Sequence, residues 1–88
     1  MVLFIGNVSK LTTEKELKEL FASFGAIKKL RLMVDKITRR SRGYAYVDML
    51  EDANALAAVQ QLNTANFMNS CLIVGVATEG QLSKIEWF

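Results

Sequence analysis

The sequence predicts an α+β fold in which two helices cover one face of a four-stranded antiparallel sheet. Four short segments have the apolar composition or the two-residue alternation of strands. Two other segments repeat apolar residues at intervals of three and four, the period of a helix with one buried face. The segments follow the order β-α-β-β-α-β, which leaves the sheet face opposite the helices uncovered.

The first strand and the first helix are marked by an apolar run and a capping signal. We expect the strand at Val2–Val8. Thr13 offers an N-cap oxygen, and Glu16 stands three residues later as its capping-box partner. Gly25 ends the helix, because glycine can take the left-handed conformation there. Between these limits one helical stripe carries the apolar residues Leu17, Leu20, Phe21 and Phe24.

The next two strands are predicted from alternation, with a polar basic loop at residues 35–42 between them. In Ile27–Val34, one face carries Leu30, Leu32 and Val34, and the other carries Lys29, Arg31 and Met33. In Tyr44–Met49, one face carries Ala45, Val47 and Met49, and the opposite face carries Tyr44, Tyr46 and Asp48.

The second helix begins near Glu51 and Asp52, where negative charge suits the helix dipole. Its apolar stripe is Ala55, Ala58, Val59 and Leu62. The last strand is expected at Cys71–Val76, with Leu72, Val74 and Val76 facing inward and Ile73 and Gly75 outward. The whole order is that of a ferredoxin-like fold. We therefore divide the chain into a domain at residues 1–78 and a C-terminal tail at residues 79–88, which packs on the domain or on the sheet face.

Composition excludes several classes of function. The 88 residues suffice for one domain, and with one cysteine and no histidine the chain offers no intramolecular disulfide and no zinc site of the usual kind. A Ser–His–Asp or Cys–His nucleophile is also excluded, so we expect neither an enzyme, a metal nor a cofactor. No apolar run approaches the roughly 20 residues of a membrane span, and a cytoplasmic protein is expected, or a nuclear one in a eukaryote.

Positive charge is concentrated in the first part of the chain. Residues 1–49 hold ten Lys or Arg and five Asp or Glu, a net of +5, whereas residues 50–88 have a net of −3. The basic residues gather at Lys28, Lys29, Arg31, Lys36, Arg39, Arg40 and Arg42. A local basic zone suits a polyanionic partner more than the total of +2 indicates. A solvated, solubilising surface is the alternative interpretation.

The uncovered sheet face carries the candidate site. Alternation places Phe4, Tyr44 and Tyr46 on that face, pointing at water. Stacking on unpaired bases is a natural use for such rings and contributes about 1–3 kcal/mol per base. Lys29, Arg31 and Arg42 lie on the same face or at its edge and can meet phosphates. Ordinary strand aromatics with no ligand are the alternative, because strands favour these residues.

Two motifs resemble those of the RNA recognition motif family. The third strand reads Arg42-Gly43-Tyr44-Ala45-Tyr46-Val47-Asp48-Met49, against Lys/Arg-Gly-Phe/Tyr-Gly/Ala-Phe-Val-x-Phe/Tyr in the family. The first strand reads Leu3-Phe4-Ile5-Gly6-Asn7-Val8, similar to the family's hexamer. The resemblance covers about residues 2–77. Arg39 and Thr64 stand where many members have glycine, and Met49 replaces an aromatic residue.

The resemblance implies a role for each matching residue. Phe4 and Tyr44 stack on successive bases, Tyr46 packs against a sugar or a base edge, and Arg42 pairs with a phosphate. Asn7 either contacts the RNA or braces the loop after the first strand. The expected RNA-binding residues are Phe4, Asn7, Lys29, Arg31, Arg39, Arg40, Arg42, Tyr44 and Tyr46. The ligand is single-stranded RNA, with single-stranded DNA left open, and post-transcriptional regulation is the expected role.

Three alternatives remain open at this point. The chain could be a protein-protein interaction module, although such relatives usually lose the exposed aromatics. An acyl-phosphate hydrolase on the same scaffold is disfavoured, because the required phosphate cradle is missing. The tail could offer Trp87 as a further stacking surface, cover Tyr46 and Ile73 until RNA displaces it, or form a homodimer.

Overall fold

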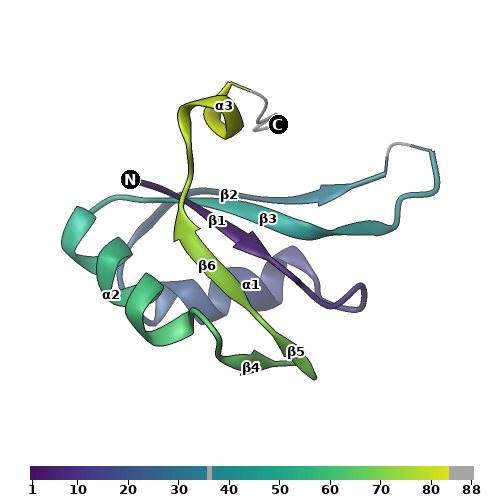
Figure 1. The fold of residues 1–88 in the computed structure, drawn as a ribbon, viewed down its shortest axis with the longest axis horizontal. Coiled ribbons are helices and arrows are strands. Elements are labelled where there is room, and N and C mark those ends of the chain that lie inside the picture. The colour runs from purple at the N-terminus through teal and green to yellow at the C-terminus, as the bar shows by residue number, and fades with distance from the viewer. Residues whose placement is uncertain (36, 84–88) are drawn as a thin grey trace.

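The computed structural model describes residues 1–35 and 37–83. Its central sheet is antiparallel, with the strand order β2-β3-β1-β6 (Figure 1). These strands are β1 (Val2–Gly6), β2 (Ile27–Val34), β3 (Ser41–Met49) and β6 (Ile73–Val76). The helices α1 (Glu14–Ala22) and α2 (Asp52–Leu62) cover one face of the sheet. The predicted ferredoxin-like fold is therefore confirmed.

The core lies between this sheet and the two helices. The predicted capping box fixes the start of α1: the Thr13 N–H donates to Glu16 Oε1 at 3.0 Å, and the Glu16 N–H donates to Thr13 Oγ1 at 3.3 Å. Apolar residues of both helices and all four strands then close the core. The largest fully buried side chains are Leu3, Ile5, Leu17, Phe21, Val47, Met49 and Leu72. With its helices on one side, the sheet leaves its other face free for a site.

The region before the last strand differs from the prediction of one strand at Cys71–Val76. It forms a small hairpin of β4 (Asn66–Phe67) and β5 (Ser70–Cys71), and only β6 joins the main sheet. Two successive left-handed residues, Met68 at φ 52° and Asn69 at φ 65°, make the tight turn of this hairpin. Val76 lies opposite the buried Leu3 and so points to the helix side of the sheet, as predicted, but it is 52% exposed at the end of the outermost strand.

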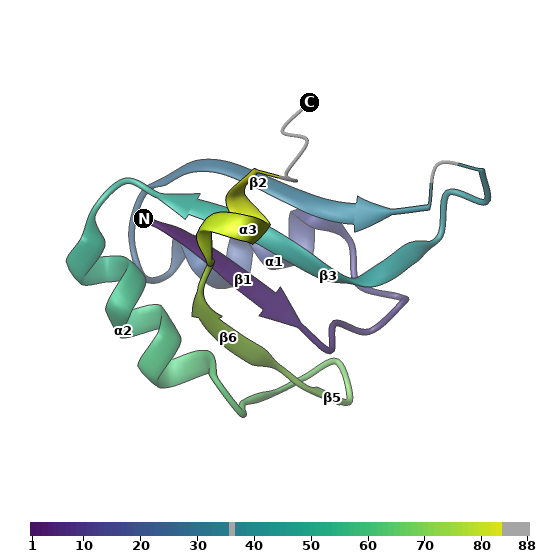
Figure 2. The ribbon, with the colours of Figure 1, turned by 45° about the horizontal axis from the view of Figure 1, so that its top comes forward.

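A short helix that alternation did not reveal follows β6. It is α3 (Glu79–Leu82), and a capping box at Thr78 starts it. The Thr78 N–H donates to Gln81 Oε1 at 2.8 Å, and the Gln81 N–H donates to Thr78 Oγ1 at 3.2 Å. Figure 2 shows α3 in front of the sheet, whereas α1 lies behind it. The start of the predicted tail therefore returns to the uncovered face.

Both positions where the chain lacks the glycine common in the family adopt a left-handed backbone. Arg39 has φ 64° and Thr64 has φ 70°. This conformation costs an L-residue roughly 1–2 kcal/mol relative to glycine. At Thr64 the branched Cβ makes the conformation more unusual still. These two departures from the family pattern are therefore local sites of strain.

Candidate nucleic-acid interface

Strand pairing aligns a row of residues across the uncovered face. Arg31 on β2 lies opposite Tyr46 on β3, Tyr46 lies opposite Phe4 on β1, and Phe4 lies opposite Gly75 on β6. Directly opposed residues of antiparallel strands point to the same side of the sheet. The row therefore has a guanidinium at one edge of the sheet, two rings in the middle, and a glycine without a side chain at the other edge.

Three rings form one cluster at the centre of this face. Phe4 lies 5.5 Å from Tyr46 and 6.0 Å from Tyr44, measured between ring centroids. Tyr44 and Tyr46 meet edge to face at 6.1 Å. Such tilted and edge-on contacts are the arrangements that aromatic pairs favour. The expected trio of Phe4, Tyr44 and Tyr46 is thus brought together by β1 and β3.

The rings are not equally accessible. Phe4 and Tyr44 are half-buried, but Tyr46 is only 6% exposed, so the expectation that all three point at water is wrong for Tyr46. Burial, and secondarily the neighbouring Tyr44, raises the pKa of the Tyr46 hydroxyl above its usual 10.0. Phe4 and Tyr44 therefore offer the ring surface, and Tyr46 supports them from between.

Gly6 allows the Phe4 ring to lie where it does. A Cβ atom placed on Gly6 would come within 2.9 Å of Phe4 Cε2 and 3.2 Å of Phe4 Cζ. The ring thus leans over the bare backbone of Gly6, two residues along the same strand face. On the row's far side, a Cβ on Gly75 would meet nothing within 4 Å. Sequence reasoning took Gly6 only as part of a motif and missed this close approach.

A hollow of about 510 Å³ adjoins the cluster. The rings of Phe4, Tyr44 and Tyr46 line one part of it, and Thr78, Gly80 and Gln81 line the rest. This volume lies within the range of small-ligand sites, about 300–1,000 Å³. Strand alternation does not reveal Thr78, Gly80 and Gln81 as site residues, although the Thr78-x-x-Gln81 spacing of a capping box signals a helix there.

Two hypotheses concern the tail. Ile73 is 56% exposed in the presence of the described residues 79–83, and the rest of the tail lies outside the described residues, so the hypothesis that the tail covers Tyr46 and Ile73 stays a prediction. Trp87, which another hypothesis assigned to stacking, lies outside the described residues.

The basic residues divide between the open face and its β2 edge. Arg31 is half-buried within the row of rings, and Arg42 is exposed on β3, next to a bulge at Gly43 where φ is 86°. Lys29 is exposed opposite Asp48 and lines a hollow between β2 and α1. Arg31 is thus paired across the strands with Tyr46, and Arg42 stands two residues before Tyr44 on the same strand.

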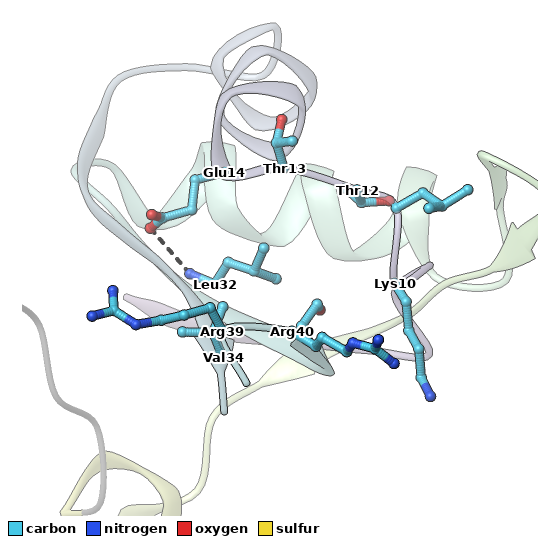
Figure 3. A pocket seen from close by; sticks show the side chains of 10 residues that line it. Lys10, Thr12, Thr13, Glu14, Leu32, Val34, Arg39 and Arg40 are labelled. Carbon is cyan, nitrogen blue, oxygen red and sulfur yellow. Dashed lines mark hydrogen bonds between the residues drawn. The ribbon is translucent and has the colours of Figure 1, made fainter. Parts of the chain in front are cut away.

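Arg39 and Arg40 lie elsewhere than the rings. They line a hollow of about 580 Å³ with Lys10 and with Glu14, the first residue of α1 (Figure 3). Figure 3 shows their guanidinium groups pointing in opposite directions, with Arg40 on the side of Lys10. The predicted polar, basic loop therefore presents these two residues at the edge of the sheet.

Asp35 holds the loop that carries these arginines. Its Oδ1 accepts the N–H groups of Ile37 at 2.8 Å and Thr38 at 2.9 Å. The Thr38 and Ile37 hydrogen bonds lower the pKa of the Asp35 carboxyl below 3.8. Main-chain bonds from Arg39 N to Asp35 O at 2.9 Å and from Asp35 N to Arg40 O at 2.8 Å close the turn. These bonds hold residues 37–40 against Asp35.

Asn7 makes a bracing contact. Its Nδ2 donates to the Cys71 carbonyl at 2.8 Å, and its backbone is left-handed at φ 54°. The side chain is nevertheless exposed at the end of β1. Of the two roles considered for Asn7, the bond to the Cys71 carbonyl corresponds to the second, in which the side chain braces the end of β1.

Comparison with known proteins identifies the family. A family model described as RNA recognition motif matches residues 3–73. The protein RbpD of Nostoc sp. (strain PCC 7120) is 42% identical over 77 residues, which are 88% of this chain and 82% of that protein. The chain belongs to the RNA recognition motif family. The family is non-enzymatic, in agreement with the expectation of a binding protein.

Solved RNA recognition motif structures share this fold. A structure of the RNA15 RRM with bound RNA (GU) has a TM-score of 0.81 and 27% identity, over 89% of this chain and 83% of that one. A Sxl-lethal protein/RNA complex has a TM-score of 0.87 and 33% identity, over 90% of this chain and 47% of that one. Both are similar to this chain across nearly all of its domain.

Two further findings bound the chemistry of the domain. Among residues 1–35 and 37–83, no three His, Cys, Asp or Glu side chains lie close enough together to hold a metal ion. In the same part of the chain, no helix has the length and apolar character needed to cross a membrane.

Proposed function

We propose that this chain binds single-stranded RNA on the uncovered face of its sheet, where bases of the RNA stack on Phe4 and Tyr44. The observation that carries the proposal is the ring cluster, in which two half-buried rings stand beside an open hollow. The membership of the family and the similarity to two complexes named for RNA support it.

The stacking step uses the unequal burial of the rings. Phe4 and Tyr44 present ring surface to two successive bases, each stack contributing about 1–3 kcal/mol. Tyr46, packed against both, keeps their orientation fixed and reaches a sugar or a base edge only at its rim. A platform already shaped before binding loses little conformational entropy when the RNA arrives.

Phosphate contacts complete the site. Arg31 lies in the same row as Phe4 and Tyr46, and Arg42 is exposed two residues before Tyr44. A guanidinium beside a stacked base can meet the phosphate of the same nucleotide. Asn7 acts through the bond to Cys71 and holds the end of β1 in place. We assign Lys29, Arg39 and Arg40 to phosphates at the β2 edge.

We assign α3 the role of a wall of the binding hollow. Thr78, Gly80 and Gln81 face the rings across it, and their hydroxyl, main-chain and amide groups can read a base edge. Deleting residues 80–88 should therefore weaken binding while the domain stays folded. Unchanged affinity would show that the tail takes no part. Homodimerisation through the tail and a cytoplasmic location stay predictions.

Chemical-shift mapping tests the proposal directly. The isotope-labelled chain is titrated with an RNA pool of about four nucleotides, enough for the two or three bases that one such domain stacks. The largest shifts should fall on β1, β3 and α3. Shifts confined to α1 and α2 would instead favour a protein-interaction module, and a parallel DNA titration shows whether the 2′-hydroxyl matters.

A further inference from the structure

Two basic hollows follow the outer edge of β2, behind the ring-bearing face. One hollow, of about 580 Å³, is lined by Leu32 and Val34 in the second half of β2. The other, of about 330 Å³, is lined by residues 27–30 in the first half of β2. Glu14 at the start of α1 lines both, so the two hollows adjoin. We call them together the edge groove.

The edge groove gathers most of the positive charge of the domain. It is lined by seven of the nine Lys and Arg residues that the structure describes: Lys10, Lys15, Lys18, Lys28, Lys29, Arg39 and Arg40. The lysines and two of the glutamates of helix α1 lie on different sides of the helix. Lys15 and Lys18 line the groove, whereas Glu16 and Glu19 line a different hollow next to Phe67. The charge is therefore one-sided and does not belong to a uniformly solvated helix.

Part of this charge has no ion-pair partner among the residues that the structure describes. Glu14 is the acidic residue of the groove, and its Oε2 accepts the Leu32 N–H at 3.2 Å, as the dashed line in Figure 3 shows. The carboxylate is thus tied to the edge of β2 rather than to Lys18, four residues further along α1. Within residues 1–35 and 37–83, Lys15, Lys18 and Lys28 form no ion pair.

We propose that the edge groove binds the phosphate backbone of the RNA that extends beyond the bases held on the sheet. This inference rests on the proposed function. Lysine ammonium groups suit phosphates, and the residues lining the groove include no aromatic side chain for stacking, so the contact is independent of base sequence. To reach the edge groove from the rings, the RNA needs to pass over one strand, β2. In that strand Arg31 lies on the side of the rings, and Leu30 and Leu32 line the groove.

The experiment compares RNA pools of about four and about sixteen nucleotides by fluorescence anisotropy at several salt concentrations. The variant is Lys15→Gln/Lys18→Gln/Lys28→Gln, all at exposed positions outside the ring cluster. Each phosphate contact contributes about 0.7 to the slope of log affinity against log salt. Loss of three contacts should lower the slope for the long RNA by about 2. The ratio of the wild-type affinity to the variant affinity for the long RNA should then fall about twentyfold as salt rises from 50 to 200 mM.

A matched control separates local contacts from net charge. Gln60→Glu/Gln61→Glu/Asn66→Asp lowers the net charge by the same amount at exposed positions of α2 and β4. Helix α2 packs against β6, at the opposite edge of the sheet from β2. The control should keep most of the affinity for the long RNA, and both variants should bind the short RNA as wild type does.

The proposal is wrong if the lysine variant keeps the wild-type affinity and slope for the long RNA, or if the control loses as much. It is also wrong if the lysine variant loses binding only to a polyglutamate peptide, since the groove would then serve an acidic protein. These results leave stacking on the short RNA intact. Failure of wild type to bind either RNA would instead overturn the proposed function.

Discussion

Substituting Gly6 tests whether the position of the Phe4 ring matters for binding. A Cβ at Gly6 would lie 2.9 Å from Phe4 Cε2, well inside ordinary contact, so the ring must tilt away in Gly6→Ala. Forcing the ring away from its preferred rotamer costs of order 0.5–1.5 kcal/mol. The cost falls on a flexible ring and not on backbone, so the domain should fold with slightly lower stability.

The expected loss of RNA affinity follows from the displaced ring. If the tilt removes the stack on Phe4, about 1–3 kcal/mol disappears, which is roughly a five- to 150-fold weaker Kd. Gly75→Ala is the matched control, because its Cβ enters open space on the neighbouring strand of the same row. Anisotropy with single-stranded RNA and thermal unfolding measure both variants.

The two glycines should behave differently. Gly75→Ala should bind within about twofold of wild type and gain a little stability, since glycine weakens a strand. A Gly6→Ala variant that binds as tightly as wild type would refute the reasoning that the bare backbone at Gly6 sets a functional ring position.

Three further predictions concern stability and pH. Thr64→Gly should relieve the left-handed strain at φ 70° and stabilise the domain by about 1 kcal/mol, raising Tm by about 4–8 °C in calorimetry, and a lower Tm would contradict this. Because the folded pKa of Tyr46 is raised, the stability that its neutral hydroxyl contributes is complete below pH 10.0 and is lost as pH rises through the folded pKa. The urea concentration at the unfolding midpoint should therefore fall over that pH range, and it should fall more in wild type than in Tyr46→Phe. Because the folded pKa of Asp35 is lowered, the stability that its carboxylate contributes is complete above pH 3.8 and is lost as pH falls through the folded pKa. The protection factors of the Ile37 and Thr38 amides, which correct for the intrinsic exchange rate at each pH, should then fall, and unchanged protection factors would contradict the assigned bonds.

The fold could be predicted because its signals are strong and local. The stripe from Leu17 to Phe24 and the alternation in Tyr44–Met49 specify a helix and a strand with one buried face each. The capping box of Thr13 and Glu16 was predicted from spacing alone and is present. Sequence also placed Phe4, Tyr44 and Tyr46 on one face, because alternation fixes the side of a strand to which each residue points.

The features that sequence missed depend on contacts between distant segments. Burial of Tyr46 depends on its packing against Phe4 and Tyr44, which alternation cannot measure. The wall formed by α3 depends on how the chain turns after Ala77. The edge groove combines α1, β2 and the loop before β3, and Lys15 and Lys18 are not part of the basic clusters visible along the sequence.

The most direct test of RNA binding by the ring cluster removes both accessible rings together. Fluorescence anisotropy of labelled single-stranded RNA should show Phe4→Ala/Tyr44→Ala weaker than wild type by at least about thirtyfold, the equivalent of about 2 kcal/mol. The control Leu50→Ala/Leu56→Ala, which truncates two exposed apolar side chains elsewhere, should bind as wild type does. Equal affinities of wild type and the folded ring variant would contradict the account.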